Sequence, residues 1–406
     1  MRQRARLRHS LSAGAALAVL LTAGGALAGQ NAIKIGVMID GSGFAQDTGG
    51  VGAVTAAEMA AADYGGKALG KPIQIVSADM QNKPDVASSI ARQWFDQDQV
   101  DAITDLPVSS VGLAVQQVGK EKKKVLLISA AATTELTGAQ CSPTSIQWAD
   151  DTAALANGTA KAVVANGGRK WFFITADFAF GAAMEGAASA VIKASGGEVV
   201  GDVKHPLGTN DYSSYLLKAQ ASGANVIGLA NVGLDSIATI RQAGEFGITQ
   251  AGQQLAGFIV FISDIHSLGL KTAQGTYVTT GYYWDDSDGT RAFAKRFFEK
   301  RQRMPTKEQA NTYAAVLHYL KAIDAAKTDD AAKVTAQMKA MPTDYFGRTG
   351  SIREDGRVLY DLALYQVKKP EESKYPWDYY RKIRDIPAAE AFKPLADGGC
   401  PFVRKD

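Results

Sequence analysis

Residues 33–66 read IKIGVMIDGSGFAQDTGGVGAVTAAEMAAADYGG, and this stretch contains a strand, a loop and a helix. Ile33–Ile39 is a short run of β-branched and other apolar residues, which is typical of a buried strand. The glycine-rich loop 40–46 precedes an alanine-rich segment, and we expect a helix over Gly52–Tyr64. Gly65 and Gly66 end that helix in the manner of a C-cap. A strand followed directly by a helix predicts a βαβ unit and therefore a parallel sheet.

The same alternation continues along the chain in two series. The first series has expected strands at Ile73–Ala78, Ala102–Thr104 and Val125–Ser129, with helices between them, and it ends near residue 149. The second series begins near Asp150 and has expected strands at 170–175, 198–205, 225–230 and 254–261. Either series is long enough to bury its own core. We therefore expect an α/β protein with two doubly wound halves, each built on a mostly parallel sheet.

The last part of the chain is expected to contribute to both halves. Helices are expected over Thr290–Arg301, Lys307–Lys327 and Ala331–Ala340, and we assign them to the first half. Residues 350–352 and Tyr360–Val367 flank a turn at 354–357, which predicts a hairpin that completes the second half. The expected boundaries are 29–149 with 282–342 for the N-terminal lobe, 150–281 with 343–395 for the C-terminal lobe, and 396–406 for a tail.

The first residues have the layout of a secretion signal. Arg2, Arg4, Arg6 and Arg8 precede an uncharged apolar run over Leu11–Ala23. This run is shorter than the roughly 20 residues that a membrane-spanning helix needs, and it leads to Ala26-Leu27-Ala28, a pattern typical of a cleavage site. We expect a signal peptide over residues 1–28, cleavage after Ala28, and a free protein in the periplasm. An uncleaved anchor is the alternative.

Charge and cysteine content restrict the partners. The chain has 44 Lys and Arg residues against 41 Asp and Glu residues, so its net charge is small and nothing points to nucleic acid. Cys141 and Cys400 are the two cysteines of the chain. In an oxidising compartment they are candidates for a disulfide that would tie the C-terminal tail to the body. Two separate thiols are the alternative, because the sequence does not give the distance between the two Cα atoms.

Enzyme motifs are incomplete in this sequence. Loop 41–46 begins like a dinucleotide-binding fingerprint after a strand, but its third glycine is missing. Gly65-Gly66-Lys67 lacks the spacing of a phosphate-binding loop, and no Gly-x-Ser-x-Gly elbow is present. No zinc-binding His-Glu-x-x-His motif occurs either. We therefore expect no catalysis, no cofactor and no metal site.

The loops after the expected strands are the candidate binding segments. In sheets of this kind, ligands bind at the carboxyl ends of the strands, where helix N-termini present unpaired backbone N–H groups that suit an anion. Ser109 and Ser110 follow one expected strand, and Thr133 follows the next. Each hydroxyl can either contact a ligand or cap a helix, and both roles remain open. We expect Ser109 and Thr133 to be the first contacts of a ligand carboxylate.

The order of these segments resembles the type I periplasmic binding proteins of ABC transporters, specifically the branched-chain amino-acid (Leu/Ile/Val) binding group. Ile33–Val37 with the Ser42-Gly43 turn is similar to that family's opening strand and loop, and Asp63–Gly66 is similar to its helix-ending motif. Asp177–Gly181 and Asp211–Ser214 occur in the family's order, and the resemblance covers nearly all of the chain after the leader. It implies two Rossmann-like lobes joined by a three-strand hinge, a small carboxylate ligand in the cleft between them, an inner-membrane permease as partner, and a monomer.

The resemblance also indicates which residues contact the ligand. It implies that loops of the first lobe hold the carboxylate, and that Phe180 stands where the family has a ligand-stacking tyrosine. Phe178 is then left to pack in the core. The expected contact residues are Phe44, Val108, Ser109, Ser110, Ala131, Thr133, Phe180, Asn231, Val232 and Phe258.

The chain departs from the amino-acid binders of this family in a way that bears on the ligand. Those proteins neutralise the ligand's ammonium group with an acidic residue after the strand that Gln254–Phe261 resembles, and residues 257–261 contain no carboxylate. Asn231 and Val232 stand in place of a family aromatic residue. An unpaired ammonium in a closed cleft costs on the order of several kcal/mol. We therefore expect an aromatic or aliphatic acid or a 2-oxo acid.

Two alternatives remain open. Asp235 or Asp264 could supply the missing negative charge, and the ligand would then be a branched-chain or other hydrophobic amino acid. The same fold and site would also serve a ligand-sensing receptor subunit.

Overall fold

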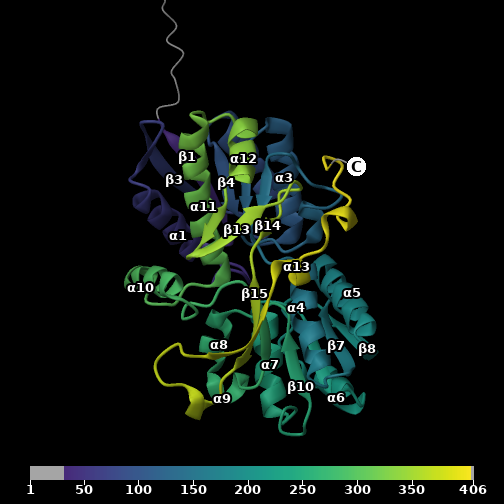
Figure 1. Ribbon diagram of the computed structural model, residues 1–406. Helices are drawn as coiled ribbons and strands as arrows, with labels where there is room; N and C mark the ends of the chain where they lie inside the picture. The colour runs from purple at the N-terminus through teal and green to yellow at the C-terminus, as the bar shows by residue number, and fades with distance from the viewer. Residues whose placement is uncertain (1–31, 404–406) are drawn as a thin grey trace, which may run out of the picture. The chain divides into compact units, whose positions relative to one another are not determined.

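In the computed structural model, residues 32–403 are described, and their strands form two large sheets and one small sheet. The expected leader over residues 1–28, with its cleavage point after Ala28, lies outside the described residues. Helices pack against the large sheets, so the α/β class and the two-lobed architecture are as the sequence predicts (Figure 1).

The first sheet has the strand order β2-β3-β1-β4-β5-β6, and its strands pair in parallel apart from the short antiparallel pair β2 and β3. α1 and α11 pack together on one face, and α2 and α3 pack together on the other. α12 packs beside α11. The elements of this half are β1 (Ile33–Ile39), α1 (Gly50–Asp63), β2 (Lys67–Ala68), β3 (Lys71–Asp79), α2 (Pro84–Asp96), β4 (Ala102–Asp105), α3 (Ser109–Lys122), β5 (Val125–Ile128), β6 (Ser145–Gln147), α11 (Lys307–Ala326) and α12 (Ala331–Ala340).

The second sheet has the strand order β16-β15-β11-β10-β9-β7-β8. Its first five strands along the chain are parallel, and β15 and β16 add an antiparallel edge. The elements of this half are α4 (Thr152–Ala165), β7 (Lys170–Ala176), α5 (Ala179–Ala194), β8 (Glu198–His205), α6 (Ser213–Ala221), β9 (Val226–Ala230), α7 (Leu234–Glu245), β10 (Gln254–Gly257), α8 (Ile262–Leu268), α9 (Leu270–Ala273), β11 (Tyr277–Thr280), β15 (Leu362–Val367), β16 (Tyr380–Ile386) and α13 (Ala388–Ala391).

In both large sheets the strand order reverses beside the first long strand. β1 has β3 on one side and β4 on the other, and β7 has β8 on one side and β9 on the other. At such a point the loops that follow neighbouring strands leave in opposite directions, and a crevice opens at the carboxyl ends of the strands. The residues after β1, β4, β7 and β9 are therefore the ones that the fold exposes to a ligand.

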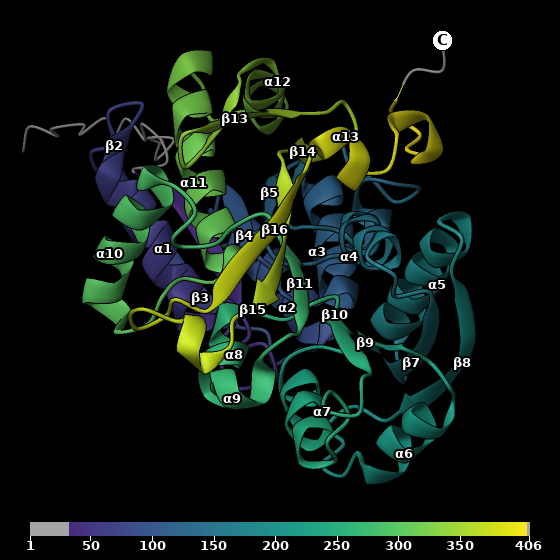
Figure 2. The ribbon, with the colours of Figure 1, turned by 60° about the horizontal axis from the view of Figure 1, so that its bottom comes forward.

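The predicted hairpin into the second half is corrected by the strand pairing. β13 (Arg348–Ile352) pairs with β12 (Thr343–Tyr345) and with β14 (Val358–Leu359), and these three strands form a separate small sheet. This sheet contacts α11 and α12, whereas β15 joins β11 and β16 in the second sheet (Figure 1, Figure 2). The reason is that the turn at Glu354–Gly356 reverses the chain tightly, so that Arg353 N bonds Arg357 O at 2.8 Å and the pairing ends before Tyr360.

Three connections carry the chain between the parts built on the two large sheets, and one carboxylate joins them. Asp150 lies in the connection from β6 to α4, and it is 2% exposed. It accepts hydrogen bonds from Gly281 N (3.2 Å) in the connection after β11 and from the Tyr360 hydroxyl (2.9 Å) in the connection before β15. Lys307, at the start of α11, donates to the same carboxylate at 3.0 Å. Asp150 therefore holds all three connections together.

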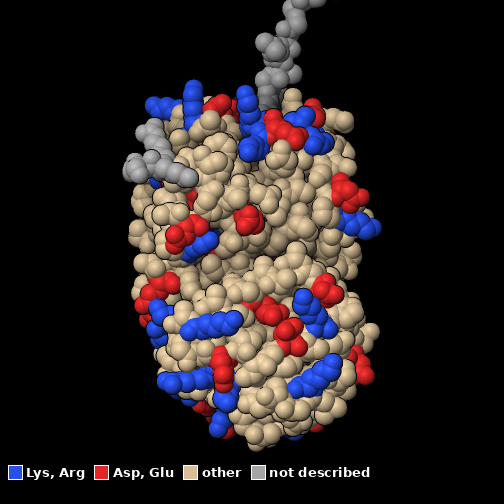
Figure 3. Space-filling view, turned by 90° about the vertical axis from the view of Figure 1, so that its right-hand side faces the viewer, with Lys and Arg blue, Asp and Glu red and all other residues tan. Residues whose placement is uncertain are grey.

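Surface charge is mixed on the face shown in Figure 3. Lysine and arginine side chains are interspersed there with aspartate and glutamate side chains, and no single-sign patch dominates this face. The expectation that the chain does not bind nucleic acid remains a prediction.

Cys141 and Cys400 form a disulfide, with their Cα atoms 5.6 Å apart. The predicted pairing is therefore present in the structure. It joins residues separated by 259 positions and ties the C-terminal tail to the segment between β5 and β6.

Replacing Cys141 and Cys400 together by serine is expected to lower the free energy of unfolding by about 2–4 kcal/mol, because the bond restricts the unfolded chain across a long loop. Equilibrium urea denaturation measures the change, and hydrogen exchange should show faster exchange in residues 393–403. Chemically reduced wild-type protein is the control and should behave like the double variant. A double variant as stable as the oxidised wild type would contradict the expectation.

Candidate ligand-binding site

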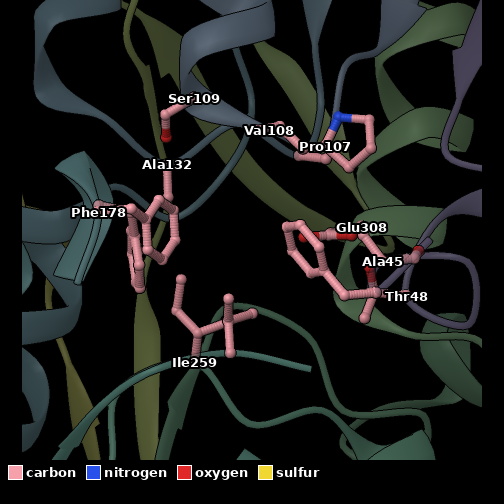
Figure 4. Close-up of a pocket in the computed structure, with 13 residues that line it drawn as sticks. Ala45, Thr48, Pro107, Val108, Ser109, Ala132, Phe178, Ile259 and Glu308 are labelled. Atoms are coloured by element: carbon pink, nitrogen blue, oxygen red, sulfur yellow. Dashed lines mark hydrogen bonds between the residues drawn. The ribbon is translucent and has the colours of Figure 1, made fainter. Parts of the chain in front are cut away.

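A cavity lies where the two sets of strand-end loops meet (Figure 4). From the first half, the loop after β1 contributes Phe44, Ala45 and Thr48, the loop after β4 contributes Pro107, Val108 and Ser109, and the loop after β5 contributes Ala130 and Ala132. The second half contributes Phe178, Phe180, Val232 and Ile259, and α11 adds Glu308.

Two long helices begin at this cavity without a capping side chain. α3 starts at Ser109 with Val108 as its N-cap residue, and α5 starts at Ala179 with Phe178 as its N-cap residue; neither makes a side-chain cap hydrogen bond. The first N–H groups of a helix have no partner within the helix, and the helix dipole adds a positive partial charge there. Both helix ends are therefore suited to a negatively charged group of a ligand.

The backbone at the end of β4 is bent into an uncommon conformation. Asp105 and Leu106 have φ values of 74° and 63°, in the left-handed region that non-glycine residues seldom adopt. This turn leads the chain into Pro107, Val108 and Ser109, which line the cavity. Strained backbone of this kind costs about 1–3 kcal/mol per residue and persists where the surrounding structure holds it in place.

The loops of the two halves also touch at the cavity. Gly233, the N-cap residue of α7, has a φ of 61°, and a Cβ placed on it would lie 2.7 Å from the carbonyl oxygen of Phe44. Only glycine fits this close approach and this conformation. The neighbouring Val232 lines the cavity beside Phe44.

Aromatic rings form much of the wall. Phe178 and Phe180 lie with their ring centroids 5.7 Å apart at an interplanar angle of 38°, and Phe44 lines the cavity from the first half. Phe180 thus lies where the sequence predicted an aromatic wall. Phe178, which was expected to pack in the core, lines the cavity as well. Such rings provide apolar contact area and favour stacking on a flat ligand.

Glu308 is the lining residue that the sequence analysis missed most clearly. It is the second residue of α11, it is 7% exposed, and its Oε2 atom is buried without a hydrogen-bond partner. Burial raises the pKa of Glu308 to about 8. The helix start could be read from the capping box Thr306–Gln309, but its position beside the loop after β1 depends on the packing of α11 against α1.

A second buried carboxyl group lies behind the cavity wall. Asp105 is fully buried, and neither of its carboxylate oxygens has a hydrogen-bond partner. Its pKa is raised well above the ordinary value, chiefly by burial and further by the nearby Glu308 and Asp40 carboxyl groups. Burial therefore favours the protonated, uncharged form of Asp105.

Three expected contact residues of the first half lie outside the cavity lining. Ser110 is exposed, and Ala131 is buried behind the wall, where it packs against Gly112 of α3. The Thr133 hydroxyl accepts a hydrogen bond from Glu135 N at 3.3 Å and so caps the short 3₁₀ helix Thr134–Leu136. For Thr133 the capping role holds, whereas neither Ser109 nor Ser110 caps α3.

Two expected contact residues of the second half are also located elsewhere. Asn231 is buried and its side chain bonds Ser236 (2.8 Å) and Thr239 (3.0 Å) within its own half. Phe258 is fully buried and stacks on Phe173 with centroids 6.1 Å apart, because the chain turns at the end of β10 and directs Ile259 to the cavity instead.

The two aspartates that could have supplied a ligand counter-charge are not in the lining. Asp235 accepts a backbone hydrogen bond from Gly208 N at 3.1 Å. Asp264 accepts from Phe261 N at 2.9 Å and so caps α8, and burial raises its pKa to about 7. Glu308 is therefore the acidic side chain of the cavity.

These features define a class of protein. The cavity is mostly apolar, its polar side chains are those of Thr48, Ser109 and Glu308, and uncapped helix N-termini begin at its wall. Among residues 32–403, no group of His, Cys, Asp and Glu side chains is arranged to hold a metal ion, and no helix has the length and apolar character needed to cross a membrane. A cavity of this kind between two α/β halves is that of a solute-binding protein.

Comparison with known proteins gives the family. A family model described as periplasmic binding protein matches residues 32–374, and the chain belongs to this family. A periplasmic binding protein from Burkholderia mallei superposes with a TM-score of 0.89 at 46% identity, over 92% of this chain and 100% of that chain. A branched-chain amino acid ABC transporter periplasmic ligand-binding protein from Burkholderia xenovorans LB400 gives a TM-score of 0.84 at 41% identity, over 91% and 99% of the two chains.

A curated relative agrees with this assignment. The Leu/Ile/Val-binding protein homolog 6 of Brucella melitensis biotype 1 is 25% identical over 328 residues, which cover 77% of this chain and 82% of that protein. The chain is thus a periplasmic substrate-binding protein of an ABC transporter and not an enzyme. Proteins of this class bind a small molecule and work with a permease in the inner membrane.

Proposed function

We propose that this protein captures a small carboxylate, an aromatic or aliphatic acid or a 2-oxo acid, and delivers it to its permease. The observation that carries the proposal is the meeting of two uncapped helix N-termini, those of α3 and α5, at one apolar and aromatic cavity. The helix ends favour a negative group, and the rings of Phe44, Phe178 and Phe180 favour an apolar body.

The absence of a charged partner for an ammonium group supports an acid over an amino acid. Glu308 is the acidic side chain that lines the cavity, and with a pKa of about 8 it is mostly uncharged at pH 7. An ammonium group buried beside a neutral carboxyl group loses its hydration without gaining an ion pair, at a cost of roughly several kcal/mol.

The ligands of solved proteins with this fold are compatible with the proposal. Solute-binding proteins from Rhodopseudomonas palustris that superpose with TM-scores of 0.79–0.81 were solved with benzoate, 4-hydroxybenzoate and 3,4-dihydroxybenzoic acid. Their identity to this chain is 19–22%, so they support the proposal only by showing that the fold accommodates aromatic acids.

A branched-chain amino acid is the second candidate, and Glu308 is the observation that favours it. An ammonium group placed beside Oε2 of Glu308 would draw the proton off that carboxyl group and form a buried ion pair. The relatives from Burkholderia xenovorans LB400 and Brucella melitensis, whose names refer to branched-chain amino acids or to Leu/Ile/Val, add to this candidate. A receptor subunit that senses the same ligand would use the same cavity.

Isothermal titration calorimetry at pH 7 separates the two candidates. Benzoate, 4-hydroxybenzoate, 4-methyl-2-oxopentanoate and leucine form the panel, and at least one of the three acids is expected to bind at least about 100-fold more tightly than leucine, a difference of roughly 2.7 kcal/mol. Leucine and 4-methyl-2-oxopentanoate are a matched pair, since they differ only in the group on the α-carbon. Leucine as the tightest ligand would overturn the proposal.

We further propose that the two sheets with their helices move as lobes about the three connections that Asp150 joins. Residues 29–149 with 282–342 and residues 150–281 with 343–395 were the expected lobes. The small sheet β12-β13-β14 contacts α11 and α12, which supports moving residues 343–359 to the N-terminal lobe. Closure of such lobes around a ligand is the usual motion of hinged binding proteins.

A further inference from the structure

Glu308 offers the cavity an oxygen atom that nothing else in the described residues satisfies. Oε2 is buried and has no hydrogen-bond partner, although a buried polar atom without one is costly. Glu308 is 7% exposed, and it lines the cavity on the side of the loop after β1 (Figure 4). An unpartnered polar atom in the wall of an apolar cavity indicates a ligand group that binds there.

The Thr48 hydroxyl lies close to the Glu308 carboxyl group. It donates a hydrogen bond to the carbonyl oxygen of Ala45 at 3.1 Å. It also interacts with the Glu308 carboxyl group, and this interaction lowers the pKa of Glu308. Oε2 is nevertheless left without a hydrogen-bond partner.

Burial is the main reason why the pKa of Glu308 is raised. The Thr48 hydrogen bond and the Lys307 ammonium lower the value, and the carboxyl groups of Asp264 and Asp150 raise it. Glu308 in turn raises the pKa of Asp105, at the end of β4, because the two carboxyl groups disfavour each other's charge.

The two polar features of the cavity lie on different sides of it. Ser109 and the start of α3 are on one side, with the serine hydroxyl directed inward, and Glu308 with Thr48 lies on another side (Figure 4). Apolar side chains, among them Val108, Phe178 and Ile259, line the cavity between them. A ligand with its carboxylate at α3 therefore presents its remote end to Glu308.

We propose that Glu308 is the specificity-determining residue of the cavity and selects carboxylates that carry a hydroxyl group remote from the carboxylate. The hydroxyl donates a hydrogen bond to the unpartnered Oε2 atom of Glu308. This inference rests on the proposed capture of an acid. A ligand with no remote donor leaves Oε2 unsatisfied, and a ligand with a methoxy group there brings two acceptors together.

Calorimetry with 4-hydroxybenzoate, 4-methoxybenzoate and benzoate tests the proposal at pH 6.5. Wild-type protein is expected to bind 4-hydroxybenzoate about 10-fold more tightly than either of the other two, the usual effect of one hydrogen bond to an otherwise unsatisfied buried atom. Glu308→Gln should keep this preference, because its side chain is uncharged and its carbonyl oxygen can accept a hydrogen bond from the ligand. Glu308→Leu should reduce the preference to within about 3-fold.

The pH dependence of benzoate binding is a second measurement. Loss of the proton from Glu308 places a second negative charge in the apolar cavity that holds the anion, so affinity should be constant below the pKa of Glu308 and fall as pH rises through about 8. Between pH 6.5 and pH 9.5 the affinity of the wild type should fall by more than about 10-fold, whereas Glu308→Gln should change by less than about 3-fold. Benzoate is used because it does not titrate in this range.

The outcomes distinguish this inference from the proposed function. Equal affinity of the wild type for 4-hydroxybenzoate and 4-methoxybenzoate would overturn the role of Glu308 and leave acid capture in place. Loss of the preference in Glu308→Gln would also overturn it, since the group would then act as an ionised carboxylate. Binding of leucine alone, weakened by Glu308→Gln, would overturn both. Should Glu308→Leu not fold, the glutamine variant and the pH series still decide.

Discussion

Replacing Ser109 by aspartate should weaken the binding of benzoate, or of whichever acid in the panel binds best, by at least about 100-fold, roughly 2.7 kcal/mol. Ser109 is the first residue of α3 and lines the cavity. A carboxylate there occupies the helix N-terminus itself, and its charge repels a bound anion strongly because the surroundings are apolar. Calorimetry at pH 7 measures the change, and circular dichroism checks that the fold is kept.

Ser110 provides a matched control one residue further along the helix. Its side chain is exposed and lies outside the cavity lining, so Ser110→Asp introduces the same charge into the same first turn. Binding should stay within about 3-fold of the wild type, and the helix should gain about 0.3–1 kcal/mol of stability from the charge at its N-terminus. Equal binding by the two variants would show that the carboxylate does not lie at the start of α3.

Replacing Asp150 by alanine should lower the free energy of unfolding by about 3–5 kcal/mol. Asp150 and Lys307 form an ion pair whose side chains are 1% and 8% exposed, and the variant leaves the lysine ammonium buried without its partner. It also removes the acceptor of Gly281 N and of the Tyr360 hydroxyl, which lie in the other two connections. Equilibrium urea denaturation measures the loss.

The exposed ion pair between Asp47 and Arg303 is the control for this prediction. Its side chains are 60% and 59% exposed, so Asp47→Ala should change stability by less than about 1 kcal/mol. The double variant Asp150→Ala with Lys307→Met should recover part of the loss, because it removes the buried charge that the single variant leaves behind. A double variant no more stable than Asp150→Ala would show that the hydrogen bonds, and not the ion pair, carry the effect.

Several elements could be predicted from local sequence because their signals are local. The helix Ala331–Ala340 was predicted with the bounds that the structure has, and Thr290–Arg301 and Lys307–Lys327 differ from α10 (Asp288–Arg301) and α11 by at most two residues. α10 and α11 begin with capping side chains, and they end at Gln302 and Lys327, two residues with positive φ. Helix ends depend on nearby residues, which a sequence displays directly.

Strand pairing was predicted less well because it depends on distant partners. β16 was not predicted, since Tyr380–Ile386 is largely polar and forms a strand only as the partner of β15 at the sheet edge. The strand expected over 254–261 ends at Gly257, where the chain leaves the sheet and turns toward α8. The hairpin assigned to the second half failed for the same reason: β13 pairs with β14 and not with β15.

The sequence by itself determined that strand-end loops with small, hydroxyl-bearing and aromatic residues would lie together, and Phe44, Val108, Ser109, Phe180 and Val232 do line one cavity. It determined this because alternating strands and helices place all such loops at the same edges of parallel sheets. Only the tertiary structure decided that Glu308 joins them. Its neighbour Thr48 is distant in sequence, and the two meet because α11 packs against α1 across the face of the first sheet, a contact between helix surfaces that local sequence patterns do not specify.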